Sequence, residues 1–275
     1  MKMRVLVAFS SLAAIILVLL LLFGVRSGGS LNENQERALK RSLRAPLTPA
    51  THLELGHNLD TNAISVLTKA LETRPGLVDK AYGWAWSNAP AATRSNLPRP
   101  LDSAAADQIR LRASALLGDP KVGNFVAPST LVKELRDPSW GIRMNALACL
   151  NNAALPKSGP EGLREEKGTI LTLVLAAAQD PQMEVRMSAV HCLGYFKEAP
   201  DQVIPVLSKA LTDNFPDVRI RAAMAFYRFD PAQAEKAGAL TTAFDCLHSN
   251  GTHGSRHLAA DFLKKEGKLP PSEEQ

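Results

Sequence analysis

One motif recurs through the C-terminal two thirds of the chain and constrains the fold more than any other feature. Three segments align without gaps, and each places an aspartate six residues before an arginine: Asp137 and Arg143, Asp180 and Arg186, Asp213 and Arg219. Weaker copies surround Arg110 and Arg256. The five arginines are separated by 33, 43, 33 and 37 residues, which is the period range of stacked helix pairs. The sequence therefore predicts an all-α chain, an α-solenoid of about five to six helix pairs.

The residues after each arginine repeat as well. An alanine follows at the third position and a large apolar residue at the seventh, a spacing that puts both on one face of a helix. These pairs are Ala113 and Leu117, Ala146 and Leu150, Ala189 and Leu193, Ala222 and Phe226, and Ala259 and Leu263. We expect this face to be buried, because a small side chain lets neighbouring helices approach closely. A further apolar segment, residues 63–71, predicts a degenerate sixth unit.

The aspartates and arginines themselves are expected to hold the stack together. An aspartate before a helix can accept hydrogen bonds from backbone N–H groups at the helix start, and an arginine can reach a carboxylate of the same or the adjacent repeat. The alternative is a row of arginines that binds an anionic ligand. The regular spacing favours a structural ladder over this row.

The combined pattern of Asp, Val-Arg and Ala-Leu, seen at Asp180, Val185-Arg186 and Ala189-Val190, resembles HEAT repeats. In particular, it resembles the short bacterial HEAT-like units related to those of phycobilin lyases. The resemblance covers residues 100–265 well and residues 60–100 loosely. It implies the solenoid fold and a curved surface that holds other macromolecules, although a few relatives act as lyases or in DNA repair.

The N-terminal part of the chain carries a membrane segment. Residues 5–25 form an uncharged apolar run of 21 residues. As a helix this run would span roughly 30 Å, the thickness of the bilayer core, whereas the apolar region of a signal peptide usually has about 7 to 15 residues. The length predicts a retained transmembrane helix. The short basic start, Lys2 and Arg4, also suits a signal peptide, so cleavage stays open.

These features divide the chain into five parts. Residues 1–4 are a short basic start, 5–25 the membrane anchor, 26–60 a tether, 61–265 the repeat domain and 266–275 a polar tail. Lys2 and Arg4 favour a cytoplasmic N-terminus, while the basic residues after the anchor favour the reverse. We weight the N-terminal flank, which predicts a repeat domain outside the cytoplasm, in the periplasm if the protein is bacterial.

The charge of the chain argues against nucleic acid as a partner. The formal net charge is +5, from 32 basic and 27 acidic residues. Three of the basic residues lie within positions 1–26, so the remainder has 29 basic and 27 acidic residues, or +2. A chain so nearly balanced has no general attraction for a polyanion.

Two regions carry candidate binding residues for a protein partner. The helix faces opposite the buried alanines place Arg112, Asn145, Ser188, His191 and Arg221 in one mixed, weakly charged groove. A segment that interrupts the repeat holds Trp84 and Trp86. Tryptophan is enriched at binding hot spots, but capping of the exposed end of the stack explains these two residues about as well.

The cysteines and histidines give weaker signals. Cys246, His248, His253 and His257 fall within twelve positions, but their spacing matches no zinc motif and favours a structural turn over a metal site. Cys149 and Cys192 occupy the same repeat position. Because packed helix axes lie about 10 Å apart, we expect two buried thiols rather than a disulfide. No cofactor is expected.

No catalytic motif is present in the sequence. The sequence thus favours a single-pass, membrane-anchored scaffold that mediates protein–protein interaction and is not an enzyme. The alternative, implied by the phycobilin-lyase resemblance, is a lyase-like or small-ligand-handling protein whose pocket would hold His191, Cys192 and Trp84.

Overall fold

The structure of the protein, a computed structural model, describes residues 33–44, 63–95, 98–123, 125–152, 162–249 and 251–269. All regular structure in these residues is helical, which confirms the predicted all-α class. The predicted membrane anchor, residues 5–25, lies outside the described part, as does the short start at residues 1–4. Among the helices that are described, none is long and apolar enough to cross a membrane.

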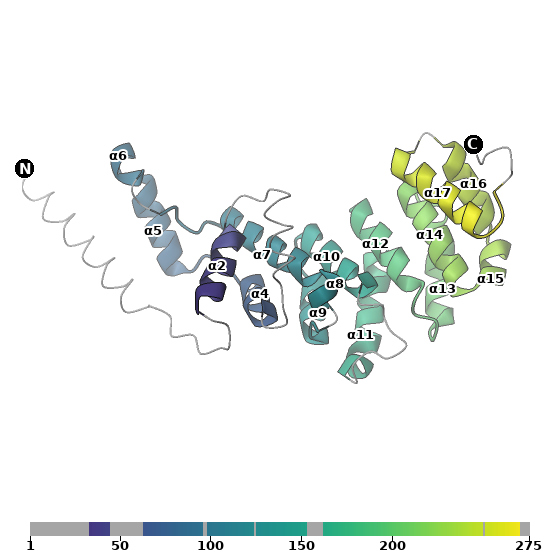
Figure 1. Ribbon diagram of the computed structural model, residues 1–275, viewed down its shortest axis with the longest axis horizontal. Coiled ribbons are helices and arrows are strands. Elements are labelled where there is room, and N and C mark those ends of the chain that lie inside the picture. Colours follow the sequence, from purple (N-terminus) through teal and green to yellow (C-terminus); the bar gives the residue numbers. More distant parts are fainter. Residues whose placement is uncertain are drawn as a thin grey trace, which may run out of the picture.

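Within the described residues, five helix pairs stack into an elongated arrangement (Figure 1). The first helices of the pairs are α4 (Ala63–Leu71), α9 (Pro128–Leu135), α11 (Gly162–Ala177), α13 (Pro200–Ala210) and α16 (Ala239–His248). The second helices are α7 (Ser103–Leu117), α10 (Trp140–Asn152), α12 (Met183–Leu193), α14 (Pro216–Phe229) and α17 (His253–Lys265). The second helices pack side by side, α7 on α10, α10 on α12 and α12 on α14, and form the continuous spine of the solenoid.

The buried face of the spine is the one that the repeat predicts. The alanine three residues after each ladder arginine has no exposed surface in any of the five units. The residue at the seventh position, from Leu117 to Leu263, is at most 1% exposed. A methyl group at the contact lets the helix axes approach closely, and the larger side chain fills the space beside it. This prediction is confirmed for every unit.

Residues 63–71 do not begin a sixth unit, contrary to the sequence-based expectation. They form α4, which packs on α7 and buries Ala63 and Leu67. The first pair is therefore interrupted by an insertion of about 30 residues that contains α5 (Leu77–Ser87) and α6 (Ala91–Arg94). The insertion separates the two helices in sequence, so the spacing of the motif alone did not pair them.

Part of the expected tether is a packed helix. α2 (Glu33–Arg44) lies against α7 and α4 and buries Leu39 and Leu43, which are four residues apart on one helix face. In addition, Nη1 of Arg112 on α7 donates a hydrogen bond of 2.8 Å to the carbonyl oxygen of Leu43. The first unit is covered at its outer side by this helix. Two short helices, α8 (Pro120–Gly123) and α15 (Pro231–Lys236), fill connections further along the chain.

Gly194 at the end of α12 marks a close approach between the backbones of two spine helices. A Cβ atom there would lie 2.9 Å from the carbonyl oxygen and 3.1 Å from the Cα of Ala225 on α14. We expect Gly194→Ala to lower the free energy of unfolding by about 2 kcal/mol, because backbone atoms cannot move aside as a flexible side chain can. Urea unfolding followed by circular dichroism measures this change.

Gly168 supplies the matched control for that substitution. It lies within α11, and a Cβ atom would meet nothing within 4 Å. Gly168→Ala should raise the free energy of unfolding by up to about 1 kcal/mol through helix propensity. Equal effects of the two substitutions would show that the close approach of α12 and α14 is not tight.

Candidate functional site

The repeated arginines and aspartates form a chain of ion pairs along one side of the spine. Arg143 donates from Nε and Nη2 to the carboxylate of Asp180 at 2.8 and 3.0 Å, and Arg186 binds Asp213 in the same way at 2.9 and 3.0 Å. The remaining nitrogen, Nη1, donates to a carbonyl oxygen of the preceding turn, at Asp137 for Arg143 and at Asp180 for Arg186. Each arginine thus joins its own turn to the next repeat.

The three ladder aspartates also bind backbone N–H groups of their own turns. The Oδ1 atom of each accepts a hydrogen bond of 2.9 to 3.0 Å from the backbone N–H two residues later. The donors are the N–H groups of Ser139, Gln182 and Phe215. This side-chain turn holds the aspartate at the start of the second helix, where its other oxygen meets the arginine of the preceding repeat.

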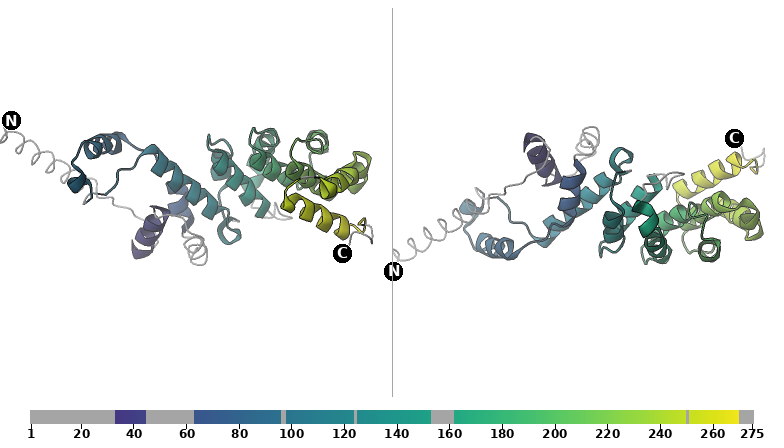
Figure 2. Two further views of the ribbon diagram at one scale, coloured as in Figure 1. Left: turned by 90° about the horizontal axis from the view of Figure 1, so that it is seen from above. Right: turned by 90° about the horizontal axis from the view of Figure 1, so that it is seen from below.

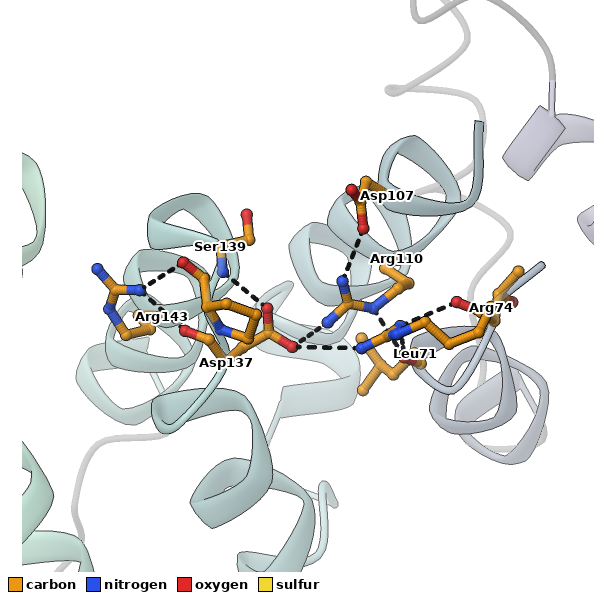
Figure 3. A network of polar contacts seen from close by, with 9 residues as sticks. Leu71, Arg74, Asp107, Arg110, Asp137, Ser139 and Arg143 are labelled. Carbon is orange, nitrogen blue, oxygen red and sulfur yellow. Dashed lines mark hydrogen bonds and ion pairs between the residues drawn. The ribbon is translucent and has the colours of Figure 1, made fainter. Parts of the chain in front are cut away.

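The first rung of the ladder is the most elaborate (Figure 3). The buried Arg110 pairs with Asp137 of the next repeat and with Asp107 one turn earlier, at 2.9 Å. Its Nε donates to the carbonyl oxygen of Leu71 at 3.1 Å, at the end of α4. Arg74 approaches the same Asp137 carboxylate from the solvent side, at 4.0 Å. The Arg110 guanidinium therefore joins the first helix pair to the second.

The ladder changes at its C-terminal end. Arg219 donates to the carbonyl oxygens of Asp213 and Asn214, at 2.9 and 3.3 Å, and in the described part of the chain no carboxylate pairs with it. The matching position of the next repeat is Asn250, which lies outside the described residues. Arg256 is exposed on α17. The carboxylate-paired rungs are therefore those of Arg110, Arg143 and Arg186.

A second polar group lies on the surface between α12 and α14. We call it the α12–α14 cluster, and it consists of His191, Tyr195, Arg221 and Arg228. Nη1 of Arg221 lies 3.4 Å from Nδ1 of His191, and the guanidinium of Arg228 lies 4.5 Å from the centre of the Tyr195 ring. Nη1 of Arg228 also donates to the carbonyl oxygen of His191 at 3.4 Å. Two cations and an aromatic ring thus share one half-buried surface.

The α12–α14 cluster carries two positive charges that no ion pair within the described chain balances. Burial, together with the charges of Arg228 and Arg221, lowers the pKa of His191 to about 4, so the imidazole is neutral near pH 7. Burial and the neighbouring Arg228 also lower the pKa of Arg221, although Asp217 opposes this. Among the described residues, neither arginine forms an ion pair with a carboxylate. An anionic group placed here would be attracted by both guanidinium groups.

The structure does not bring the other predicted partner-binding residues to this cluster. Nδ2 of Asn145 donates to the carbonyl oxygen of Leu111 on the preceding helix at 3.3 Å, and Arg112 binds Leu43 as described. The carbonyl oxygen of Ser188 accepts a bond of 3.2 Å from Nδ2 of Asn151. These three residues join neighbouring helices, while His191 and Arg221 share the cluster.

Trp84 and Trp86 do not cap the stack. They lie on α5, which with α6 stands away from the helix pairs in all three views (Figures 1 and 2). The side chain of Trp84 is 70% exposed, while the ring of Trp86 is covered by the guanidinium of Arg94 at 5.4 Å. The capping interpretation is therefore wrong, and the outer side of the first pair is occupied by α2 instead.

The Cys and His side chains near the C-terminus do not gather around a common point in the described structure. Cys246 is buried with its Sγ 3.6 Å from the carbonyl oxygen of Pro216, and His248 is exposed with Nδ1 2.9 Å from the carbonyl oxygen of Phe244. His253 is the first residue of α17 rather than part of the turn before it, and its ring stacks on that of His257. In the described segments, no three His, Cys, Asp or Glu side chains gather as a metal site would require.

Cys149 and Cys192 are free and buried in the structure. Burial raises the pKa of both thiols, to about 12 for Cys149. A thiol that stays protonated and inaccessible is a poor nucleophile. Neither cysteine therefore offers an attacking group for covalent chemistry.

A cavity of about 370 Å³ lies between the ends of α4 and α9. Three basic and three acidic side chains line it: Arg74, Lys133, Arg136, Glu72, Glu134 and Asp137. Asp137 is already bound by the ladder, and Lys133 pairs with Glu72 at 3.6 Å. The lining thus mixes both signs of charge and forms neither a clearly anionic nor a clearly cationic site.

Glu134 is the unusual member of that lining. Glu134 is 3% exposed, and its Oε1 atom has no hydrogen-bond partner within the described structure. Burial raises the pKa of Glu134 to about 7; the neighbouring Ser114 hydroxyl opposes the shift and the charge of Asp137 adds to it. Repeat spacing did not reveal this carboxyl, because its position in α9 has no counterpart in the ladder motif.

The α12–α14 cluster also contains two residues that the sequence did not predict as binding residues, Tyr195 and Arg228. Each lies nine residues after a ladder arginine, at equivalent repeat positions. Extending the repeat comparison by two positions would have placed both on the same side of the spine as His191 and Arg221. The contact between the two residues, across adjacent units, depends on how the helices pack.

The stacked helix pairs with their ladder define an α-solenoid repeat protein. The family model of HEAT repeats matches residues 128–227 and, in an overlapping match, residues 170–250. Residues 128–250 are thus similar to HEAT repeats, which agrees with the resemblance noted in the sequence. None of the curated proteins matches the chain.

Several solved structures resemble the chain at low identity. A designed armadillo repeat protein in complex with the peptide (KR)4 is 19% identical, with a TM-score of 0.47 over 84% of this chain and 91% of the other. An engineered protein is 18% identical, with a TM-score of 0.49 over 86% and 94%. Kap121p is 20% identical, with a TM-score of 0.46 over 84% of this chain and 25% of its own.

Proposed function

We propose that the protein is a single-pass, membrane-anchored HEAT-repeat scaffold that binds an acidic segment of a protein partner at the α12–α14 cluster. The single observation that supports this most is the pair Arg221 and Arg228. Both guanidinium groups lie on one surface with a tyrosine ring, and neither forms an ion pair with a carboxylate of the described chain. Arginine and tyrosine are enriched at protein interfaces, and arginine binds carboxylates with two parallel hydrogen bonds.

The membrane anchor in this proposal rests on the sequence. Residues 5–25 have the length and apolar character of a transmembrane helix, and Lys2 and Arg4 favour a cytoplasmic N-terminus. The repeat domain would then lie outside the cytoplasm, in the periplasm of a bacterium. Retention of the full-length protein in membranes washed with alkaline carbonate tests the anchor, and release into the wash would contradict it.

We expect Arg221→Glu/Arg228→Glu to reduce partner affinity about 100-fold or more, because two attractive contacts become repulsive. The full-length protein would be purified by affinity from its own membranes in mild detergent, and the co-purifying polypeptides identified by mass spectrometry. The wild type should retain one polypeptide in near-stoichiometric amount, cross-linked through an acidic segment. The double variant should lose it.

The control is Lys209→Glu/Lys236→Glu, which changes the net charge equally at exposed residues on α13 and α15. It should bind like the wild type. Arg221→Gln/Arg228→Gln gives a second, milder loss of binding if the glutamates unfold the protein. Equal recovery of the partner with both arginine variants would refute the assignment of the cluster.

The pocket expected for a lyase-like protein is not assembled in the structure. Trp84 lies on α5 in the first unit, whereas His191 and Cys192 lie on α12 in the third, and Cys192 is completely buried. A protein that purified with a bound small molecule and without a polypeptide would nevertheless favour ligand handling over the scaffold.

A further inference from the structure

The exposed face of α5 is apolar, which is the reverse of a normal surface helix. Leu77, Ala81 and Trp84 are spaced four and three residues apart and lie on one side of the helix, with Val78 beside them. Leu77 is 86% exposed and Val78 is 60% exposed. This continuous face meets water in the described structure, so it is a candidate docking surface.

The opposite side of α5 is held in place by the chain itself. The hydroxyl of Tyr82 donates to the carbonyl oxygen of Pro98 at 2.7 Å, and a Cβ atom at Gly83 would lie 3.8 Å from Pro100. Trp86 is covered by Arg94. The helix is therefore oriented, and its apolar side is directed away from the segment that returns to α7.

The position of α5 along the chain indicates what lies nearby. α5 belongs to the same first unit as α7, against which α2 is fixed by Leu39, Leu43 and the hydrogen bond from Arg112. Only residues 26–32 separate α2 from the apolar run 5–25. Even fully extended, that connection spans about 25 Å. If residues 5–25 cross the bilayer, the first unit and its α5 arm are held close to the membrane surface.

The charge around α5 complements an anionic membrane. Residues 74–100 contain four basic residues and one acidic residue. The basic residues are Lys80, Arg94 and Arg99, together with Arg74, whose guanidinium lies 4.0 Å from Asp137. The single acid, Asp79, is bound to the N–H of Gly76 at 2.8 Å. Exposed tryptophan, aliphatic residues and flanking lysine or arginine are typical of a helix that lies in the membrane interface.

From these observations we infer that the apolar face of α5, formed by Leu77, Val78, Ala81 and Trp84, docks onto the surface of the bilayer that carries the anchor. This inference rests on the anchor of the proposed function. With two points of attachment, the transmembrane segment and α5, the solenoid would hold a fixed orientation on the membrane.

Tryptophan fluorescence in brominated vesicles tests this docking. The chain has three tryptophans, so Trp86→Phe/Trp140→Phe leaves Trp84 as the reporter, and Trp84→Phe/Trp86→Phe leaves Trp140 on α10. The full-length variants are reconstituted into vesicles of phosphatidylcholine and phosphatidylglycerol at 3:1, with plain or brominated acyl chains. We expect bromine to quench about half of the Trp84 emission and less than a tenth of the Trp140 emission.

A third variant separates docking from anchoring. Leu77→Ser/Val78→Ser, in the Trp84-reporter background, should lose the quenching while the protein still floats with the vesicles. Unquenched Trp84 in floating protein would overturn the inference and leave the anchor standing, whereas failure to float would overturn the anchor. Trp84 emission that responds only to an added partner polypeptide would assign the face to a protein and overturn the inference as well.

Discussion

Replacing Arg186 with alanine should destabilise the solenoid by about 3 kcal/mol, because it removes one member of a partly buried ion pair together with the other contacts of the guanidinium. The side chains of Arg186 and Asp213 are 14% and 16% exposed, and two hydrogen bonds join them. The substitution also leaves the carbonyl oxygens of Asp180 and Pro181 without the Nη1 donor, and removes the guanidinium that covers the Phe215 ring. Urea unfolding of the full-length protein in mild detergent, followed by circular dichroism, measures the loss.

Arg219→Ala is the matched control, because this arginine makes the carbonyl contacts without a carboxylate partner in the described chain. Its loss should cost about 1 kcal/mol, the usual contribution of such hydrogen bonds. The difference between the two variants isolates the ion pair between repeats. An Arg186→Ala protein that unfolds at the wild-type midpoint but no longer binds its partner would instead indicate that the arginine row is a binding site.

Replacing Glu134 with glutamine should stabilise the protein at alkaline pH by about 3 kcal/mol, which corresponds to a pKa displaced from 4.5 to about 7. The folded state binds the proton more tightly than the unfolded state does. Between pH 4.5 and pH 7 the folded protein therefore carries more protons, and its stability falls as the pH rises. Well above pH 7 the ionised Glu134 lowers the free energy of unfolding by its full effect, whereas below pH 4.5 it has no effect. Glutamine keeps the shape and removes the charge.

The pH dependence is measured as the difference in unfolding free energy between Glu134→Gln and wild type from pH 4 to pH 9. Subtraction removes the contributions common to both proteins, such as that of His191. Glu72→Gln is the control: it lines the same cavity, but its side chain is 68% exposed, so its difference should stay within about 0.5 kcal/mol at every pH. A flat difference for Glu134→Gln would show that this carboxyl is ionised in the folded protein at little cost.

Much of the spine could be predicted because every repeat uses the same residue types at the same spacing. Ala189 and Leu193 fall on one helix face by their spacing, and Asp180 precedes a helix where an acceptor is needed. The candidate site was predicted only in part. The structure brings His191 and Arg221 together, whereas Asn145 and Arg112 join neighbouring helices, since their donors meet carbonyl oxygens that are distant in sequence.

The amino-acid sequence by itself determined the helical class, the period of the repeat and the buried face, because these depend on spacing within single helices. It also carries the apolar run on which the membrane anchor is proposed. Only the tertiary structure decided that α4 pairs with α7 across an insertion, that α2 covers the first unit, and that α5 stands apart with its apolar face exposed. It likewise placed Arg228 over Tyr195 and buried Glu134, whose Oε1 has no hydrogen-bond partner in the described part of the chain. These features arise from contacts between segments far apart in the chain, which no local spacing records.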